Sequence, residues 1–340
     1  MPPLPRNETI ARADDLDAEI GFFAGLGFRL VEILPADDPR EALLVHDDLA
    51  LRLRRGHQQS VTVALAGRAE TAVSPAGNRV ESTSTGIARP VIEPAMVSVG
   101  PDSDWVTGRA GMLYRDLVPG RLGGSVIASH IRIPTGGPVP DYVHHHEVAF
   151  QLIHCHRGWV RVVYEGQGDP FVLHPGDLVI QPPGIRHRVL ESSDEMHVVE
   201  IGWPAEHATR PDTDFDLPGP LLTDDHRWGG QRFVRHHERA VRSGPGSIDT
   251  GVGSGTDGLA QAETVELTAG SRMATPKRPA GTFDFWFVDD GRLSATVGSA
   301  AAIDLVEGSS LVVPPGRDAT FTAVAPTRLL HVMVDTSHAA

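Results

Sequence analysis

Two stretches of this sequence repeat each other at an offset of 132 to 133 residues, and this repeat limits the possible folds more than any other feature. The first stretch contains Gly158 and the run 176–184 (GDLVIQPPG), and the second contains Gly291 and the run 308–316 (GSSLVVPPG). Similarity at a fixed offset indicates a duplicated structural unit. The sequence therefore predicts two tandem domains of like topology.

Length and composition indicate which kind of domain is repeated. The chain has 340 residues, and hydrophobic cores tend to divide above roughly 250 to 300 residues, so two or three domains are expected. It contains 36 Gly and 27 Pro but only 6% aromatic residues. Glycine and proline favour turns, so this balance indicates many short strands and a mainly β fold.

Charge and cysteine usage exclude several classes of partner. The net charge of -14 would repel a phosphate backbone, so nucleic acid is not expected as a partner. The one cysteine, Cys155, cannot form an internal disulfide. The sequence contains neither a signal-peptide pattern nor an apolar run of about 18 residues, so we predict a cytoplasmic protein without a membrane partner.

Residues 1–65 predict a small module of their own. An amphipathic stretch over 14–28, with Asp15 as the N-cap, follows one strand-like run and precedes three more, which gives the order βαβββ. This order and the phrase LGFRLVEILPADDP resemble a half-module of the glyoxalase, or vicinal oxygen chelate, superfamily. The runs TIARA and LALRLR lack the His or Glu ligands of that superfamily. We therefore expect a structural or dimerising module without a metal, followed by a linker over residues 66–100.

The segment 137–191 carries the most specific motifs. The first motif is Gly137, His144-x-His146, Gln151 and Gly158, and the second is Gly176, Pro182-x-Gly184-x-x-His187 and Glu191. Together they resemble both signature stretches of the cupin superfamily. The resemblance implies a bicupin: a mainly β chain with two tandem cupin (double-stranded β-helix) barrels, at 101–215 and 216–340, preceded by the βαβββ module.

The spacing of three histidines has a physical reason. Side chains alternate along a strand, so His144 and His146 point to the same face while His145 points away. The Pro-x-Gly turn reverses the chain so that His187 adds a third imidazole from another strand. Three neutral nitrogens suit one divalent ion and leave open coordination positions, as in a catalytic site. The resemblance favours Fe(II), with Zn, Mn, Ni or Cu as alternatives.

Other residues are candidates for the chemistry around that ion. Gln151 stands where the family has Glu or sometimes Gln, so it coordinates the metal, orients a water or substrate near it, or only packs in the interior. Tyr142 and Glu191 are candidates for hydrogen bonding or proton transfer at the pocket mouth, or are structural. Cys155 is expected to be buried and inert. His154 and His156 point to the opposite face, toward the other domain or a partner.

The second repeat lacks the same ligands. Aligning Gly291 with Gly158 places Lys277, Pro279 and Asp284 at the positions of His144, His146 and Gln151, and Ala319 at the position of His187. We therefore expect a degenerate barrel without a metal at the equivalent point. The pair His236-His237 is expected to lie on the surface, because adjacent strand residues face opposite sides.

Several functions remain possible for such a chain. Three histidines without a fourth carboxylate resemble the iron-dependent cupin dioxygenases, which implies a small chelating substrate, aromatic or diketone-like. A redox-neutral decarboxylase, isomerase or lyase using Zn or Mn as a Lewis acid is the first alternative. A non-enzymatic small-molecule or metal sensor is the second. A homodimer is possible under each hypothesis.

Overall fold

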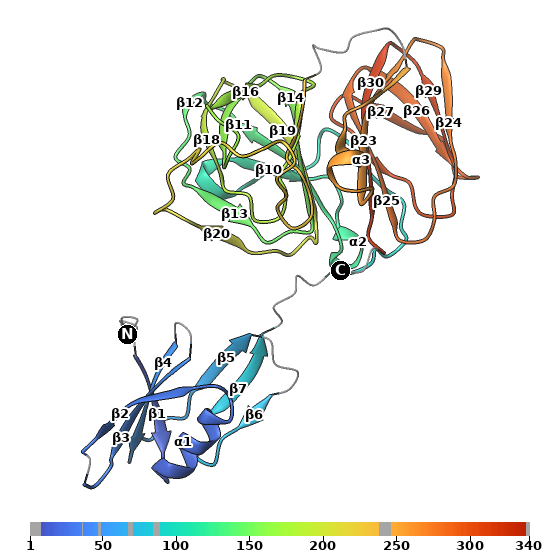
Figure 1. Cartoon of the computed structure of the whole chain (residues 1–340). Helices are drawn as coiled ribbons and strands as arrows, with labels where there is room; N and C mark the ends of the chain where they lie inside the picture. Colours follow the sequence, from blue (N-terminus) through green and yellow to red (C-terminus); the bar gives the residue numbers. More distant parts are fainter. Residues whose placement is uncertain are drawn as a thin grey trace. The chain divides into compact units, whose positions relative to one another are not determined.

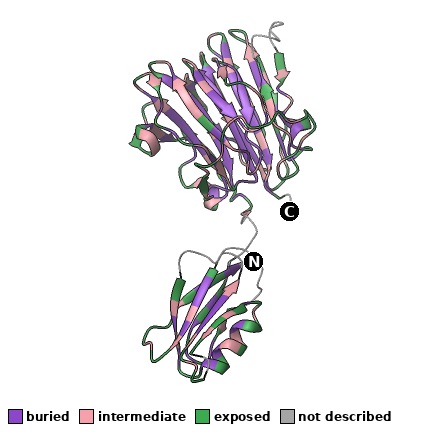
Figure 2. Ribbon diagram, turned by 60° about the vertical axis from the view of Figure 1, so that its left-hand side comes forward, coloured by how far each residue is buried: buried purple, intermediate pink, exposed green. Residues whose placement is uncertain are grey.

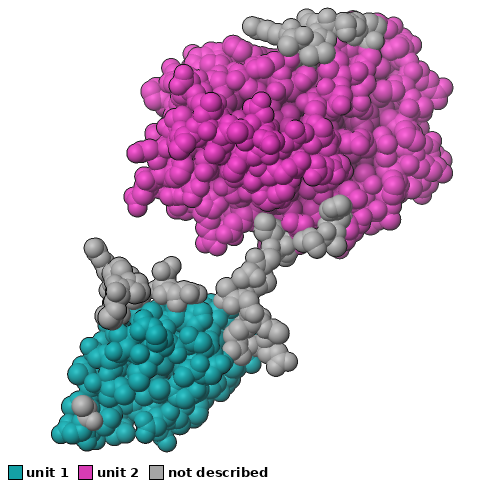
Figure 3. Space-filling model, viewed as in Figure 1, with its two compact units in different colours: residues 1–86 teal, residues 87–340 magenta. Residues whose placement is uncertain are grey.

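The computed structural model describes residues 8–35, 37–46, 49–66, 71–83, 89–237 and 246–337. The chain forms two compact units, residues 1–86 and 87–340 (Figure 3). The first unit therefore ends at residue 86, whereas the sequence predicted that the first module ends at residue 65. Among the described residues, no helix has the length and apolar character needed to cross a bilayer.

The first unit contains the predicted βαβββ order. Its four-stranded sheet has the order β1-β4-β3-β2, with β1 and β4 parallel. Asp15 caps the helix by accepting hydrogen bonds from the main-chain amides of Asp17 and Ala18, both at 3.1 Å. The elements are β1 (Glu8–Ala13), α1 (Leu16–Ala24), β2 (Arg29–Leu34), β3 (Glu41–His46) and β4 (Leu49–Arg55).

A second, three-stranded sheet extends this unit into the predicted linker. It consists of β5 (Thr62–Ala66), β6 (Ala72–Val73) and β7 (Arg79–Thr83), in the order β5-β7-β6. Val63 and Val80 of this sheet pack in the same core as Phe23 and Leu53. Part of the segment 66–100 is therefore folded with the module rather than serving as a linker.

The second unit begins with a jelly-roll domain built from two sheets, and this architecture confirms the predicted mainly β fold (Figure 1). A short 3-10 turn, η1 (Arg109–Gly111), and α2 (Arg121–Gly124) lie between its first strands. The seven-stranded sheet, in spatial order, is β21 (Val234–His236), β17 (Leu178–Ile180), β14 (Phe150–Arg157), β19 (Met196–Trp203), β11 (Ile127–Ile133), β10 (Leu113–Asp116) and β9 (Val106–Thr107). The facing sheet is β16 (Phe171–Leu173), β15 (Val160–Tyr164), β18 (His187–Ser192), β13 (His144–His146) and β20 (Thr209–Pro211), with β12 (Gly137–Pro138) paired to β18.

A second jelly-roll domain follows with the same plan. Its larger sheet is β22 (Gly246–Asp249), β23 (Ala260–Leu267), β30 (Thr327–Asp335), β25 (Thr282–Asp290), β28 (Ser310–Val312) and β8 (Val97–Val99). Its smaller sheet is β24 (Arg272–Thr275), β29 (Ala319–Ala323), β26 (Arg292–Val297) and β27 (Ile303–Val306). The helix α3 (Val252–Gly255) precedes β23.

The two domains exchange strands. The strand β8 comes before the first domain in the sequence but pairs with β28 of the second, and β21, which follows the first domain, pairs with β17 of the first. The second domain therefore contains β8, which lies outside both predicted ranges, 101–215 and 216–340. The first domain contains β21, which lies in the range predicted for the second. This exchange makes residues 97–99 part of a sheet rather than of the predicted linker.

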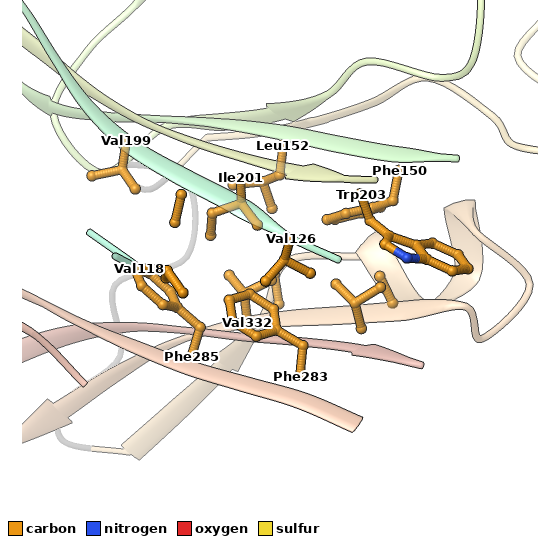
Figure 4. Packing of buried hydrophobic residues seen from close by; sticks show 14 of the residues in the cluster. Val118, Val126, Phe150, Leu152, Val199, Ile201, Trp203, Phe283, Phe285 and Val332 are labelled. Atoms are coloured by element: carbon orange, nitrogen blue, oxygen red, sulfur yellow. The ribbon is translucent and has the colours of Figure 1, made fainter. Parts of the chain in front are cut away.

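A shared core lies between the two larger sheets. Phe150, Leu152 and Trp203 of the first domain pack with Phe283 and Phe285 of the second (Figure 4). Buried residues run along the strands of this unit (Figure 2). Because side chains alternate along β14, the residues between these, such as Gln151, face the interior of their own domain. The same strand thus supplies both the inter-domain core and the wall of an internal site.

Candidate metal centre

Three histidines converge inside the first jelly-roll domain. His144 and His146 lie on β13, and His187 lies opposite His144 in the register of β18. The candidate ligand atoms of the three side chains all lie within 4.8 Å of one another. The strand alternation and the turn before His187 thus bring the predicted trio to one point. Among the described residues, it is the one group of three or more His, Cys, Asp or Glu side chains with this geometry.

Hydrogen bonds fix how each ring is turned. Nδ1 of His144 lies 2.8 Å from the carbonyl oxygen of Tyr142, and Nδ1 of His187 lies 3.0 Å from that of Ile185. A carbonyl oxygen only accepts, so both rings carry their proton on Nδ1 and keep the Nε2 lone pair. Nδ1 of His146 contacts Oγ1 of Thr209 at 3.0 Å. Such partners orient metal-binding histidines in known sites.

The site keeps its imidazoles uncharged. Burial lowers the pKa of His144, His146 and His187. Neighbouring positive charge lowers it further: that of Arg109 for His144, that of the other two rings for His146, and that of the His144 ring for His187. Neutral imidazole is the form that binds metal. The three residues present therefore fit a divalent ion.

An ion pair between the half-buried Arg109 and the buried Asp141 lies beside the trio. Arg109, on η1, donates a hydrogen bond from Nη1 to Oδ1 of Asp141, and its Nη2 lies 3.3 Å from Nε2 of His144. Asp141 is buried and also accepts a hydrogen bond from the amide of Val189 at 2.9 Å. The guanidinium is thus held next to the nitrogen that faces the centre of the site, where it would attract an anion.

A cavity of about 400 Å³ opens onto the trio. Most of its wall is apolar and comes from both sheets of the domain. The charged side chains on the wall are Arg109, Arg188 and Glu200. The apolar wall includes Ile131, Ile153, Val162, Leu173, Met196 and Val198. Such a cavity suits a small molecule with an apolar body and few polar groups.

Gln151 is joined to a carboxylate that sequence reasoning missed. Its Nε2 donates a hydrogen bond to Oε1 of Glu200 at 2.5 Å. The Gln151 side chain is buried, and the structure gives its Oε1 no hydrogen-bond partner among the described residues. Glu200 lines the cavity, whereas Gln151 does not. The sequence does contain a clue to Glu200, because it is a charged residue at an inward position of the otherwise mostly apolar strand 196–203.

The other predicted site residues lie outside the cavity. Glu191 forms an ion pair with Arg161 at 3.0 Å, with both side chains partly exposed. Tyr142 packs against His144 with ring centroids 5.7 Å apart and is 40% exposed. Neither side chain belongs to the cavity wall. Tyr142 contributes to the centre through its carbonyl oxygen rather than its hydroxyl.

Histidines elsewhere in this domain bind the other domain or lie at its edge. His154 and His156 both contact Oδ1 of Asp289 in the second domain, at 3.0 and 2.8 Å. His236 lies on β21, which pairs with β17, and it is buried, contrary to the prediction of a surface residue, whereas His237 is exposed as predicted. Cys155 is fully buried, and burial raises the pKa of its thiol, as expected for inert packing.

The equivalent region of the second domain contains a different arrangement. Asp284, which aligns with Gln151, contacts Nε2 of His331 at 2.9 Å and accepts a hydrogen bond from Nε1 of Trp286 at 2.8 Å. Lys277 is exposed, and Ala319 is buried where the first domain has His187. The second domain thus has no imidazole at the aligned positions Lys277 and Ala319, and an ion-paired network lies in the register of Gln151 and Glu200.

Known proteins share this fold. Residues 129–202 match the family model of the cupin domain, while no curated protein sequence matches the chain significantly. The salicylate 1,2-dioxygenase of Pseudaminobacter salicylatoxidans is 17% identical with a TM-score of 0.54, over 73% of this chain and 86% of that one. Another structure of that enzyme contains gentisate. The oxalate decarboxylase of Bacillus subtilis is 15% identical with a TM-score of 0.51, over 74% and 78% of the two chains.

Proposed function

We propose that this chain, whose residues 129–202 form a cupin domain, is a mononuclear Fe(II)-dependent dioxygenase acting on a small chelating substrate, aromatic or diketone-like. The observation that carries the proposal is the trio His144, His146 and His187, whose candidate ligand atoms lie within 4.8 Å of one another beside a mostly apolar cavity. Three protein ligands leave positions open for substrate and dioxygen. A bound Fe(II) ion would supply the redox chemistry that lets electrons of the chelated substrate reach dioxygen.

The protein groups around the trio have separable tasks. The three imidazoles hold the ion through Nε2 while Tyr142 O, Ile185 O and Thr209 Oγ1 keep the rings oriented. Arg109 sits close enough to His144 to bind an anionic oxygen of a substrate held at the centre. Asp141 fixes this guanidinium in place. The apolar wall excludes water from the reacting groups.

The proposed substrate class follows from the cavity. A volume of about 400 Å³ and a mostly apolar wall accommodate a ring-sized carbon skeleton. An anionic or enolisable group is required to chelate the ion and to pair with Arg109. Hydroxybenzoates, catechols and β-diketones meet both requirements.

Oxygen uptake by anaerobically purified protein tests this function. The Fe(II)-loaded protein is mixed with each class of substrate in an oxygen-electrode cell, and the products are analysed. We expect stoichiometric oxygen uptake with at least one hydroxybenzoate, catechol or β-diketone, and its loss in H187A. Consumption of a substrate without oxygen uptake would contradict the proposal.

One observation favours a redox-neutral reaction as the second candidate. Glu200 places a carboxylate on the cavity wall, where it could transfer a proton during decarboxylation, isomerisation or elimination. In that case Zn or Mn would act as a Lewis acid. Turnover under strict anaerobiosis separates this candidate from a dioxygenase.

For the first unit we propose a structural or dimerising role without a metal. Its sheet order β1-β4-β3-β2 agrees with a βαβββ half-module, and its resemblance to the glyoxalase superfamily stays a prediction. Deleting residues 1–86 should leave the metal content of the remaining chain unchanged. Loss of metal binding in that truncated chain would contradict this role.

A further inference from the structure

Glu200 is a charged residue on the mostly apolar wall of the cavity. Glu200 lies on β19, and it is the one Asp or Glu among the described residues that line the cavity. Its neighbours Val198 and Gly202 face the same side because side chains alternate along the strand. An apolar strand position that faces a core is an unfavourable place for a charge. A carboxylate there indicates a binding or reactive role.

The structure satisfies only part of this carboxylate. Gln151 Nε2 donates to Oε1 at 2.5 Å, and no described Lys, Arg or His forms an ion pair with Glu200. Arg109, a cation of the same cavity wall, is already paired with Asp141. Carboxylates bind up to about four hydrogen-bond donors, so Glu200 keeps acceptor capacity for a molecule in the cavity.

Glu200 is separate from the metal ligands. The group whose ligand atoms lie within 4.8 Å of one another contains His144, His146 and His187 but not Glu200. Tyr114, another residue of the cavity wall, has its pKa raised by burial and, next, by the negative charge of Glu200. Glu200 therefore lines the cavity near Tyr114 and lies outside the group of candidate ligand atoms.

The cavity thus has two polar positions of opposite kind. Arg109 and the trio form a position for an anionic, chelating group, and Glu200 forms a position for a hydrogen-bond donor. An apolar wall joins the two. A ligand that pairs with both needs a chelating acid at one point and a hydroxyl or amine at another.

We propose that Glu200 is a specificity-determining residue that accepts a hydrogen bond from a substrate hydroxyl outside the metal-chelating pair, and that Gln151 holds the carboxylate in position for it. The preferred substrates are then small acids with an additional hydroxyl group. The identity of the chelating end rests on the proposed function, whereas the hydroxyl preference is a property of binding alone.

Anaerobic calorimetry on the Zn-loaded full chain tests this proposal without turnover. The probes are salicylate and the dihydroxybenzoates that add one hydroxyl to it, gentisate included. All share one chelating pair, so differences among them report on the added hydroxyl. A hydrogen bond to a carboxylate corresponds to about a 10- to 100-fold gain in affinity, and we expect this gain over salicylate for at least one isomer.

Three variants assign the gain to Glu200. E200Q should reduce this gain to about threefold or less and leave zinc content unchanged, because the amide oxygen still accepts the hydrogen bond from Gln151 but an uncharged amide forms only a weak hydrogen bond with the hydroxyl. E200D keeps the charge but withdraws it by one methylene, so it should retain an intermediate preference and serves if E200Q does not fold. E191Q, the same change at a carboxylate outside the cavity, should preserve the full preference.

The results separate this inference from the proposed function. An E200Q protein that keeps the isomer preference, or a wild type that has none, would overturn the role of Glu200. A preference lost in E200Q without any oxygen uptake by Fe(II)-loaded wild type supports Glu200 and counts against the dioxygenase. Failure of all the acids to bind would overturn both.

Discussion

The two jelly-roll domains have polar side chains at the same two strand positions, but the chemical groups at those positions differ. Gln151 and Glu200 of the first domain occupy the register of Asp284 and His331 of the second. In the first domain the pair joins an amide to a carboxylate at 2.5 Å, and in the second it joins a carboxylate to an imidazole at 2.9 Å. The equivalent frame therefore holds polar groups in both domains.

The difference lies in which polar groups keep free bonding capacity. His331 of the second domain has a hydrogen-bond partner on both ring nitrogens, Glu263 at 2.7 Å from Nδ1 and Asp284 at 2.9 Å from Nε2. Burial lowers the pKa of His331, but the two carboxylates outweigh burial, so the pKa is raised. In the first domain Nε2 of His144 has Arg109 as its hydrogen-bond partner, at 3.3 Å, and the buried Oε1 of Gln151 has none among the described residues. Polar groups that a protein buries without partners mark sites where a ligand completes the bonding.

The interior volume differs in the same way. In the interior of the second domain, Trp286 stacks on His331 with ring centroids 3.7 Å apart. Trp286 has the same strand register as Ile153 of the first domain. Ile153 is much smaller and lines the cavity of the first domain. The exchange of one side chain thus accounts for part of the difference between a packed interior and a binding site.

The largest effect is expected from breaking the second network. The H331A change leaves the buried carboxylate of Asp284 without its imidazole partner, and loss of one member of a buried ion pair costs about 3 to 5 kcal/mol. The matched H146A change in metal-free protein should cost less, about 1 kcal/mol, because it removes one neutral hydrogen bond, to Oγ1 of Thr209, rather than a member of an ion pair. Urea unfolding of both variants measures the two costs. Equal costs would contradict the distinction between the domains.

A second variant carries the packing of the second domain into the first. The I153W change should fill part of the cavity and weaken salicylate binding by about tenfold or more, since an added ring competes for the space of the ligand. Metal content should stay the same, because Ile153 does not belong to the trio. Calorimetry and elemental analysis check the two outcomes. Unchanged ligand affinity would show that the ligand binds elsewhere.

A smaller effect is expected in the pH dependence of stability. The folded-state pKa of His331 is raised above its ordinary value near 6.5, so the stability that it contributes is complete below that value and is lost as the pH rises through the folded pKa. The free-energy difference between wild type and H331A should therefore narrow between pH 6 and pH 9. Urea midpoints at several pH values test this. A difference that widens with pH would contradict the assignment of a charged His331.

The smallest effect is expected at Glu191. Its ion pair with Arg161 is partly exposed, and such pairs contribute about 0 to 1 kcal/mol. The E191Q change should leave unfolding free energy, metal content and turnover nearly unchanged. A loss of turnover would restore Glu191 as a catalytic candidate and would place the reaction outside the described cavity.

Part of this comparison was predictable from the sequence. Strand alternation and the Pro-x-Gly turn bring His144, His146 and His187 together because both are local rules. Arg109 and Glu200 are 91 residues apart in the sequence and belong to no shared motif. Their placement depends on strand pairing, which local patterns do not specify.

The domain limits show the same restriction. The order βαβββ followed from periodicity, but the sheet formed by residues 62–83 is short and rich in small residues, so its composition resembled a linker. The exchange of β8 and β21 joins segments that are more than 50 residues from their partners. Neither feature leaves a periodic signal in one sequence.

The amount of metal bound per chain tests the central claim most directly. Elemental analysis of anaerobically purified wild type, H187A and K277A compares the trio with the exposed lysine that aligns with His144 in the second domain. We predict about one divalent ion per chain for wild type and K277A and almost none for H187A. Full metal loading of H187A would contradict a centre built on these three imidazoles.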